Sequence, residues 1–156
     1  MFSEAARHQV AFNAKFLKSM SPPDGTPLIF SYGFPNQGEA YNSTSGYFVS
    51  PYQGLYYVSA TTAGFDINQR ANFYLYVDST DVICLGTNYN NGHYVMTTVH
   101  AVLYLNAGQR VWIGSDGSTY NTSYGTFFSG FLLSHDFAWT GWRFRWVESK
   151  SGLSFS

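Results

Sequence analysis

Two polar segments carry the side chains best suited to binding chemistry in this sequence. Residues 88–94 and 116–124 both combine tyrosines with small polar residues and histidine or aspartate. Aromatic rings stack on the C–H faces of sugars, and amide or carboxylate groups hold the hydroxyls. The two segments therefore favour a carbohydrate site, with the candidate residues Tyr89, Asn90, Asn91, His93, Asp116, Tyr120 and Tyr124.

A structural explanation of the same residues stays open beside this one. Asn, Asp, Gly and Ser are the residues that turns require, and tyrosines pack readily in loops. Loops at strand ends are also where binding residues are expected. The pattern alone does not separate the two interpretations.

Motifs of catalysis are absent from the sequence. It has no Gly-x-Ser-x-Gly elbow, no His-Glu-x-x-His pair, no phosphate loop and no Gly-x-Gly-x-x-Gly. The spacing of the four histidines and Cys84 suggests no shared site, so we expect no enzymatic activity. Two sequons, at Asn42 and Asn121, would permit N-glycosylation in a secreted protein.

Composition favours one globular domain that associates with itself. The chain has 156 residues, of which 20% are aromatic and only 11% charged. Such a chain leaves apolar patches that a second copy can cover. Between Ser19 and Trp142 the only basic residues are Arg70 and Arg110, against seven acids. A nucleic-acid partner is excluded because this body has no basic face.

Three further expectations concern cysteine and targeting. Cys84 is the only cysteine, and its apolar neighbours favour a small buried core residue. No run of eighteen apolar residues is present, so we expect no membrane span. Charged residues interrupt every apolar run before residue 20, so a secreted form would have a signal peptide that is not part of this sequence.

Short aromatic and β-branched runs separated by turn residues indicate an all-β sandwich or barrel of about ten strands. Glycine-containing aromatic runs such as 126–133 further suggest strands covered on both faces. The predicted strands are 10–16, 28–32, 46–50, 54–62, 71–77, 82–85, 94–105, 110–113 and 126–133.

Several of these runs, in order, resemble the C1q globular domain, within the wider C1q and tumour-necrosis-factor fold group. The similar pieces are Val10-Ala11-Phe12-Asn13-Ala14, Leu28-Ile29-Phe30, Tyr41-Asn42 with Ser45-Gly46-Tyr47-Phe48, Pro51 with Gly54-Leu55-Tyr56-Tyr57-Val58, Val102-Leu103-Tyr104-Leu105 with Ala107-Gly108-Gln109-Arg110-Val111-Trp112, and Phe128-Ser129-Gly130-Phe131-Leu132-Leu133 with His135-Asp136. With no collagen repeat and many tyrosines, the chain most resembles invertebrate, especially molluscan, members.

The resemblance implies a ten-stranded jelly-roll sandwich that assembles as a homotrimer and is secreted, without enzymatic activity. Some relatives bind calcium through loop oxygens, which suggests Asp81 and Asp116 as candidate ligands here. It also implies a lead-in at 1–9, the globular domain at 10–136 and an extension at 137–156 that the family usually lacks. That extension contains Trp142-Arg143-Phe144-Arg145-Trp146, which favours an added edge strand over a surface for membranes or anionic glycans.

Two functions follow as hypotheses. The first is lectin-like pattern recognition in innate immunity, in which trimers bind glycans or microbial surface polysaccharides. The alternative is a cytokine-like or structural ligand that binds a protein receptor through grooves between subunits.

Overall fold

The computed structural model describes residues 9–16, 25–64, 72–87, 95–115 and 125–135, which form nine strands. Ten were expected for the full jelly roll. The strands are β1 (Ala11–Lys15), β2 (Tyr32–Gln37), β3 (Phe48–Val49), β4 (Gly54–Gly64), β5 (Asn72–Val77), β6 (Thr80–Thr87), β7 (Val95–Leu105), β8 (Arg110–Ser115) and β9 (Phe127–His135).

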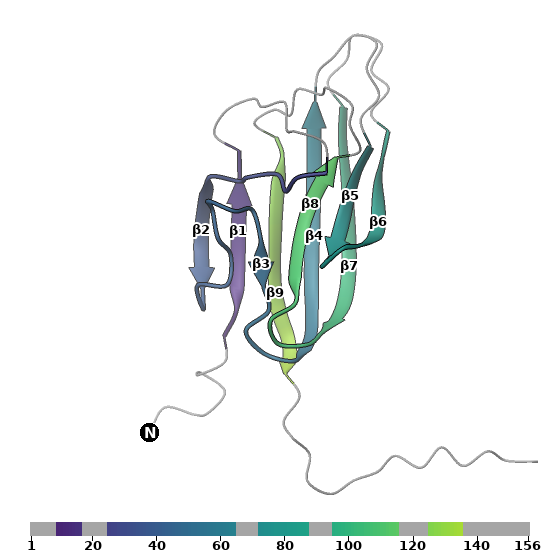
Figure 1. Ribbon diagram of the computed structural model, residues 1–156. Helices are drawn as coiled ribbons and strands as arrows, with labels where there is room; N and C mark the ends of the chain where they lie inside the picture. Colours follow the sequence, from purple (N-terminus) through teal and green to yellow (C-terminus); the bar gives the residue numbers. More distant parts are fainter. Residues whose placement is uncertain (1–8, 17–24, 65–71, 88–94, 116–124, 136–156) are drawn as a thin grey trace, which may run out of the picture.

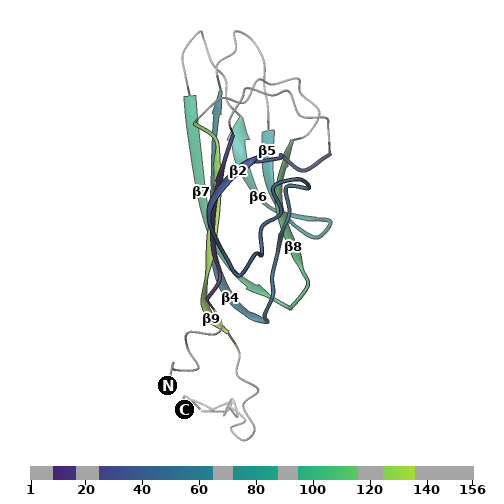
Figure 2. The ribbon, with the colours of Figure 1, turned by 90° about the vertical axis from the view of Figure 1, so that its left-hand side faces the viewer.

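These strands form two antiparallel sheets that face each other, and the described residues contain no helix. The five-stranded sheet has the order β2-β1-β9-β4-β7, and the four-stranded sheet has the order β3-β8-β5-β6. In Figure 1 the strands run along the long axis of the sandwich, and in Figure 2 the two sheets are seen from the side as two layers. This is the predicted all-β sandwich with jelly-roll connections.

Aromatic rings fill the space between the sheets around Phe12. The ring centroid of Phe12 lies 4.9 Å from that of Phe48, on the opposite sheet, and 4.9 Å from that of Phe128 on the neighbouring strand. A third ring, Tyr41, stacks on Phe12 at 5.2 Å. Offset-stacked and edge-to-face pairs of this kind add to the free energy of burial. The core therefore joins β1, β3 and β9 through one cluster of rings.

Tyr41 also supplies the hydrogen bonds that an irregular segment needs. Its hydroxyl accepts the backbone N–H of Phe30 at 3.1 Å and donates to the Phe30 carbonyl at 3.2 Å. Both groups of Phe30 are thereby satisfied in the interior, where unpaired backbone groups are costly. Burial raises the pKa of Tyr41 far above its ordinary value, so the phenol stays protonated.

Two glycines of the predicted strands are required by close packing. Gly46 has a φ of +79°, and a Cβ there would lie 2.5 Å from the Leu28 carbonyl oxygen. Gly130 faces the core, where a Cβ would lie 2.9 Å from the Tyr57 carbonyl oxygen and 3.0 Å from Phe12. Any larger residue at either position would force the neighbouring backbone to move.

The strand predicted at 28–32 is placed differently in the structure. Leu28 and Phe30 are buried, and the Leu28 N–H donates to the Ile113 carbonyl, but these residues form no extended ladder. The second strand is instead β2, where all six side chains are exposed. The predicted strand was therefore a buried connection between the two sheets, and the true edge strand follows it.

Cys84 is exposed, which corrects the expectation that it belongs to the core. It lies opposite Tyr74 on the outer face, whereas its neighbour Leu85 is buried. Side chains alternate between the two faces of a strand, so an apolar run need not be buried at every position.

The expectation that the aromatic runs are covered on both faces is also wrong for the single chain. Along β9, Phe128 is fully buried while Phe127 and Phe131 are exposed. The described residues of one copy therefore leave the outer face of the five-stranded sheet uncovered.

Candidate functional site

The predicted sugar-binding residues Tyr89, Asn90, Asn91, His93, Asp116, Tyr120 and Tyr124 lie outside the described residues. The strand ends on either side of these segments are described. On the four-stranded sheet, Thr87 pairs with Asn72, and Ser115 pairs with the next residue, Phe73. On the five-stranded sheet, Val95 and Phe127 both pair with the last residues of β4, at the same end of the sandwich. The described residues that flank both segments thus lie at one end of the sandwich, the upper end in Figure 1.

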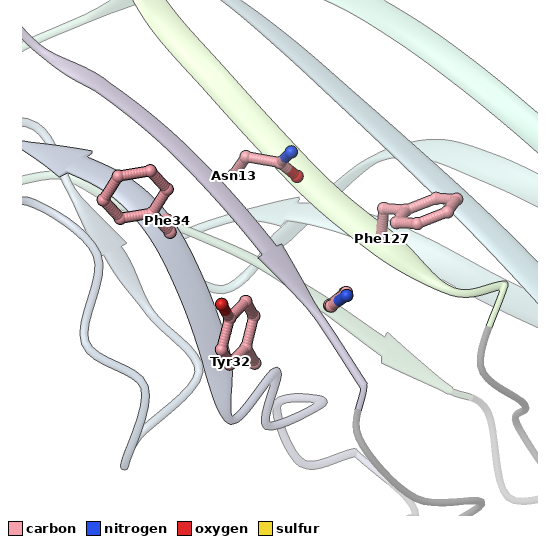
Figure 3. Close-up of a pocket in the computed structure, with 5 residues that line it drawn as sticks. Asn13, Tyr32, Phe34 and Phe127 are labelled. Atoms are coloured by element: carbon pink, nitrogen blue, oxygen red, sulfur yellow. The ribbon is translucent and has the colours of Figure 1, made fainter.

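An open cavity of about 240 Å³ lies at this same end, on the outer face of the five-stranded sheet. It is lined by Asn13, Lys15, Tyr32, Phe34 and Phe127. In Figure 3, Tyr32 and Phe34 project from β2 on one side, Phe127 from β9 on the other, and Asn13 from β1 between them.

Strand pairing explains why these five side chains meet. Lys15 pairs with Tyr32 on one side and with Phe127 on the other, so the three form one row across β2, β1 and β9. Asn13 lies two residues before Lys15 on β1, and Phe34 lies two residues after Tyr32 on β2. Residues two apart on a strand face the same side, so both side chains lie on the face of Lys15 and Tyr32. The sequence reasoning missed this cavity, because a signal spread over three distant strands is visible only once their register is known.

Lys15 is the distinctive polar group of the cavity. Its ammonium lies 5.0 Å from the centroid of the Tyr32 ring, a cation–π contact. Among the described residues the one ion pair joins Arg110 and Asp78, on the other sheet. Lys15 therefore has no carboxylate partner in the described part of the chain.

Toward the opposite end of the strands, the same outer face carries an apolar surface. Val102 is 58% exposed, Tyr104 52%, Phe131 43% and Leu133 50%. Tyr57 lies between Val102 and Phe131 in the strand register, and its hydroxyl forms a 2.5 Å hydrogen bond with Nδ1 of His100. We call these residues, Tyr57, Val102, Tyr104, Phe131 and Leu133, the apolar face.

On the outer side of the four-stranded sheet, polar groups are hydrogen-bonded to one another and aromatic rings stack on one another. The Asp78 carboxylate accepts the Arg110 backbone N–H and the Gln109 side-chain amide, both at 3.0 Å. The Arg110 backbone N–H is the main cause that lowers the pKa of Asp78, and the Gln109 side chain is the next. Trp112 stacks on Tyr76 with ring centroids 4.1 Å apart and donates its indole N–H to the Asp78 carbonyl at 2.8 Å. This cluster holds a turn together.

The candidate calcium ligands are not brought together by described residues. Asp81 is exposed near the start of β6, at the end of the sandwich away from Ser115, and Asp116 lies outside the described residues. Within the described ranges no three His, Cys, Asp or Glu side chains cluster as metal ligands would. Calcium binding stays a prediction.

The sequon at Asn42 is presented on an exposed turn. The side-chain oxygen of Asn42 accepts the backbone N–H groups of Thr44 and Ser45, at 2.8 and 3.1 Å. The amide nitrogen, which is the atom that would carry a glycan, donates no hydrogen bond among the described residues. Glycosylation at Asn42 stays a prediction, and Asn121 lies outside the described residues.

Comparison with known proteins decides the family. The profile of the C1q domain matches residues 11–133. The chain belongs to the C1q domain family. The globular domain of zebrafish complement 1qA protein superposes with a TM-score of 0.67 at 18% identity, covering 81% of this chain and 99% of that one. Eiger TNF from S. frugiperda gives 0.68 at 14% identity, covering 88% of this chain and 100% of that one.

Murine APRIL has the same fold, with a TM-score of 0.60 at 12% identity, over 80% of this chain and 99% of that one. The expected C1q resemblance and jelly-roll fold are therefore confirmed. C1q-domain proteins generally act by recognition or as ligands, are typically secreted, and commonly form trimers. No helix among the described residues of this chain is long and apolar enough to cross a membrane.

Proposed function

We propose that this protein is a secreted, non-enzymatic recognition protein of innate immunity whose C1q domains assemble as a homotrimer and bind glycans or microbial surface polysaccharides. The observation that carries the proposal is the apolar face, which the described residues of one copy leave uncovered. Four of its five side chains are about half exposed. Single exposed apolar residues are normal on a protein surface, but a group of this kind indicates an interaction surface.

Assembly through the apolar face would bury its aromatic and aliphatic groups against another copy. Tyrosine and phenylalanine are enriched at the centres of protein interfaces, where they bury large area at low entropic cost. Closed symmetry then limits the number of copies, and trimers are typical of the family.

A single binding end of the domain is supported by the strand ends that flank the two predicted sugar-binding segments, because these strand ends all lie at one end of the sandwich. In a trimer built on parallel copies, these ends would point the same way. Each site could then be weak, because a repetitive polymer engages several sites at once and gains avidity without new contacts.

A glycan array with the wild-type protein tests the proposal, and a variant that does not assemble tests its mechanism. We expect competable binding to a polymeric glycan and a loss of at least tenfold when assembly is lost, since avidity gains are commonly 10²–10⁴. Binding to the monosaccharide should be unchanged. Equal losses for polymer and monosaccharide, or a silent array, would contradict the proposal.

A second candidate is a cytokine-like ligand that binds a protein receptor through grooves between subunits. It is favoured by the likeness of fold to Eiger TNF and APRIL. A silent glycan array together with one specific cell-surface protein captured by the assembled form, and not by the monomer, would support this candidate.

A further inference from the structure

The cavity at the end of β1 has features that its surroundings do not explain. Lys15 and Arg110 are the only lysine or arginine residues in the described ranges, and Arg110 is already paired with Asp78. Three aromatic side chains stand around Lys15, and the most exposed, Phe34, is 78% accessible. A cation and exposed rings together suit a ligand that is both anionic and partly apolar.

We propose that this cavity binds an acidic sugar ring. The carboxylate or sulfate of the sugar pairs with the Lys15 ammonium, its C–H face packs on Phe127 or Tyr32, and Asn13 bonds a hydroxyl. This inference rests on the proposed glycan recognition and names the class of sugar that one site takes.

The size and place of the cavity agree with such a ligand. At about 240 Å³ it is smaller than the ~300–1,000 Å³ of drug-sized sites, which suits one ring and not an oligosaccharide. It lies beside β2, an edge strand, at the Lys15–Phe127 end of β1 and β9, whereas Phe131 of the apolar face lies opposite Ala11, at the other end of the same strands. Small side chains, Ser59 and Ser129, occupy the row between the cavity and the apolar face.

The charge pattern also favours an anion over a neutral sugar. The acids in the described ranges are Glu39, Asp78 and Asp81, and none of them lines the cavity. An anion placed near Lys15 therefore meets no like charge from the residues that line the cavity. Hydrogen bonds to charged groups are worth more than those between neutral groups, so the ammonium would dominate selectivity.

The test compares glucuronate, glucose 6-sulfate and glucose, which share one ring, by calorimetric or NMR titration of the assembled protein. We expect both anions to bind about tenfold more tightly than glucose, as a charge-assisted hydrogen bond implies. A preference for glucuronate alone would identify the ligand as a carboxylate, and a preference for the sulfate would identify a sulfated sugar.

Variants locate the site. Lys15→Gln should reduce the affinity for glucuronate to that for glucose, and Lys15→Arg should restore most of it. Arg110→Gln removes the same charge from the opposite sheet and should leave binding unchanged. The preference for the anion should weaken at high salt in the wild type and not in Lys15→Gln. Equal losses in Lys15→Gln and Arg110→Gln would overturn the proposal.

Two further results would also overturn it. Glutamate binding as tightly as glucuronate would mean that the ring is not recognised. Binding seen only in a dissociated variant would mean that assembly covers the cavity.

If Lys15→Gln keeps full affinity for glucuronate while the wild type still binds polymers on the array, the assignment of the sugar to this cavity is wrong and the proposed function stands. A silent array with retained glucuronate binding would reject the proposed function separately.

Discussion

The two sheets of the sandwich present contrasting outer surfaces. On the four-stranded sheet, Trp112 is only 8% exposed because Tyr76 and Tyr47 pack against it, and its indole N–H is hydrogen-bonded. On the five-stranded sheet, Val102 is 58% exposed. Both surfaces carry apolar groups, but among the described residues the indole of Trp112 is covered by its neighbours, whereas the side chain of Val102 is not.

This contrast separates side chains that stabilise the fold from those left for another surface. Substitutions on the four-stranded sheet should lower the free energy of unfolding, because they remove contacts made within one copy. Substitutions on the apolar face should leave each copy folded and change what it binds. The following predictions test that separation.

Val102→Asp should dissociate the assembly while each copy stays folded. A charge at the centre of an apolar interface would be desolvated without a partner, at a cost of several kcal/mol. Analytical ultracentrifugation at micromolar concentration should give a single subunit in place of a trimer. Val49→Asp, at an exposed valine of the other sheet, is the matched control and should leave the mass unchanged. A wild type that sediments as one folded subunit would refute assembly altogether.

Trp112→Ala should destabilise the folded chain by about 3–5 kcal/mol, as expected for truncating a buried tryptophan. The substitution removes the stacking on Tyr76 and the hydrogen bond to the Asp78 carbonyl. Urea denaturation measures the loss. The oligomeric mass of the folded fraction should stay that of the wild type, so an effect on mass without an effect on stability would reverse our assignment of the two surfaces.

Tyr41→Phe should cost about 1–3 kcal/mol, since it leaves the buried N–H and C=O of Phe30 unpaired. The ring stacking on Phe12 would be kept. Thermal and urea denaturation of the variant and the wild type give the difference. A neutral result would mean that water replaces the hydroxyl, and the connection from Leu28 to Phe30 would not depend on Tyr41.

Asp78→Asn should have the smallest effect, under about 1 kcal/mol at neutral pH, because the carboxylate is partly exposed and solvent screens it. The pKa of Asp78 is lowered in the folded chain, so its ionised form stabilises folding above the unfolded pKa of about 3.9. That contribution disappears as the pH falls through the folded value. The stability difference between wild type and variant should therefore shrink between neutral pH and pH 3 in urea titrations, and a constant difference would assign it to packing.

The sequence predicted those elements whose side chains alternate between core and solvent. The strands β4, β7 and β9 end within two residues of their predicted bounds, because each has its more buried positions separated by more exposed ones. The edge strand β2 has no buried side chain, and therefore no pattern to detect. Leu28 and Phe30 do have a strand-like pattern, but they belong to a buried connection. There the Tyr41 hydroxyl forms hydrogen bonds with the backbone N–H and C=O of Phe30 in place of a neighbouring strand.

The candidate site was harder to predict than the fold. Cys84 was assigned to the wrong face because a continuous apolar run does not show which of its residues point inward. The cavity around Lys15 depends on the pairing of β1 with both β2 and β9, which joins residues more than a hundred positions apart. Composition suggested self-association, which stays a prediction, but the structure was needed to identify the uncovered sheet.

One consequence of the topology concerns how the domain can be attached to something else. Ala11, which begins β1, pairs with Phe131 near the end of β9, while Lys15 and Phe127 meet at the far side of the same strands. A linker or solid support joined near Val10 or His135 would consequently hold the domain by its base and leave the lysine cavity facing outward. Immobilised sensors made in this orientation should respond to dissolved sugars as well as the free protein does.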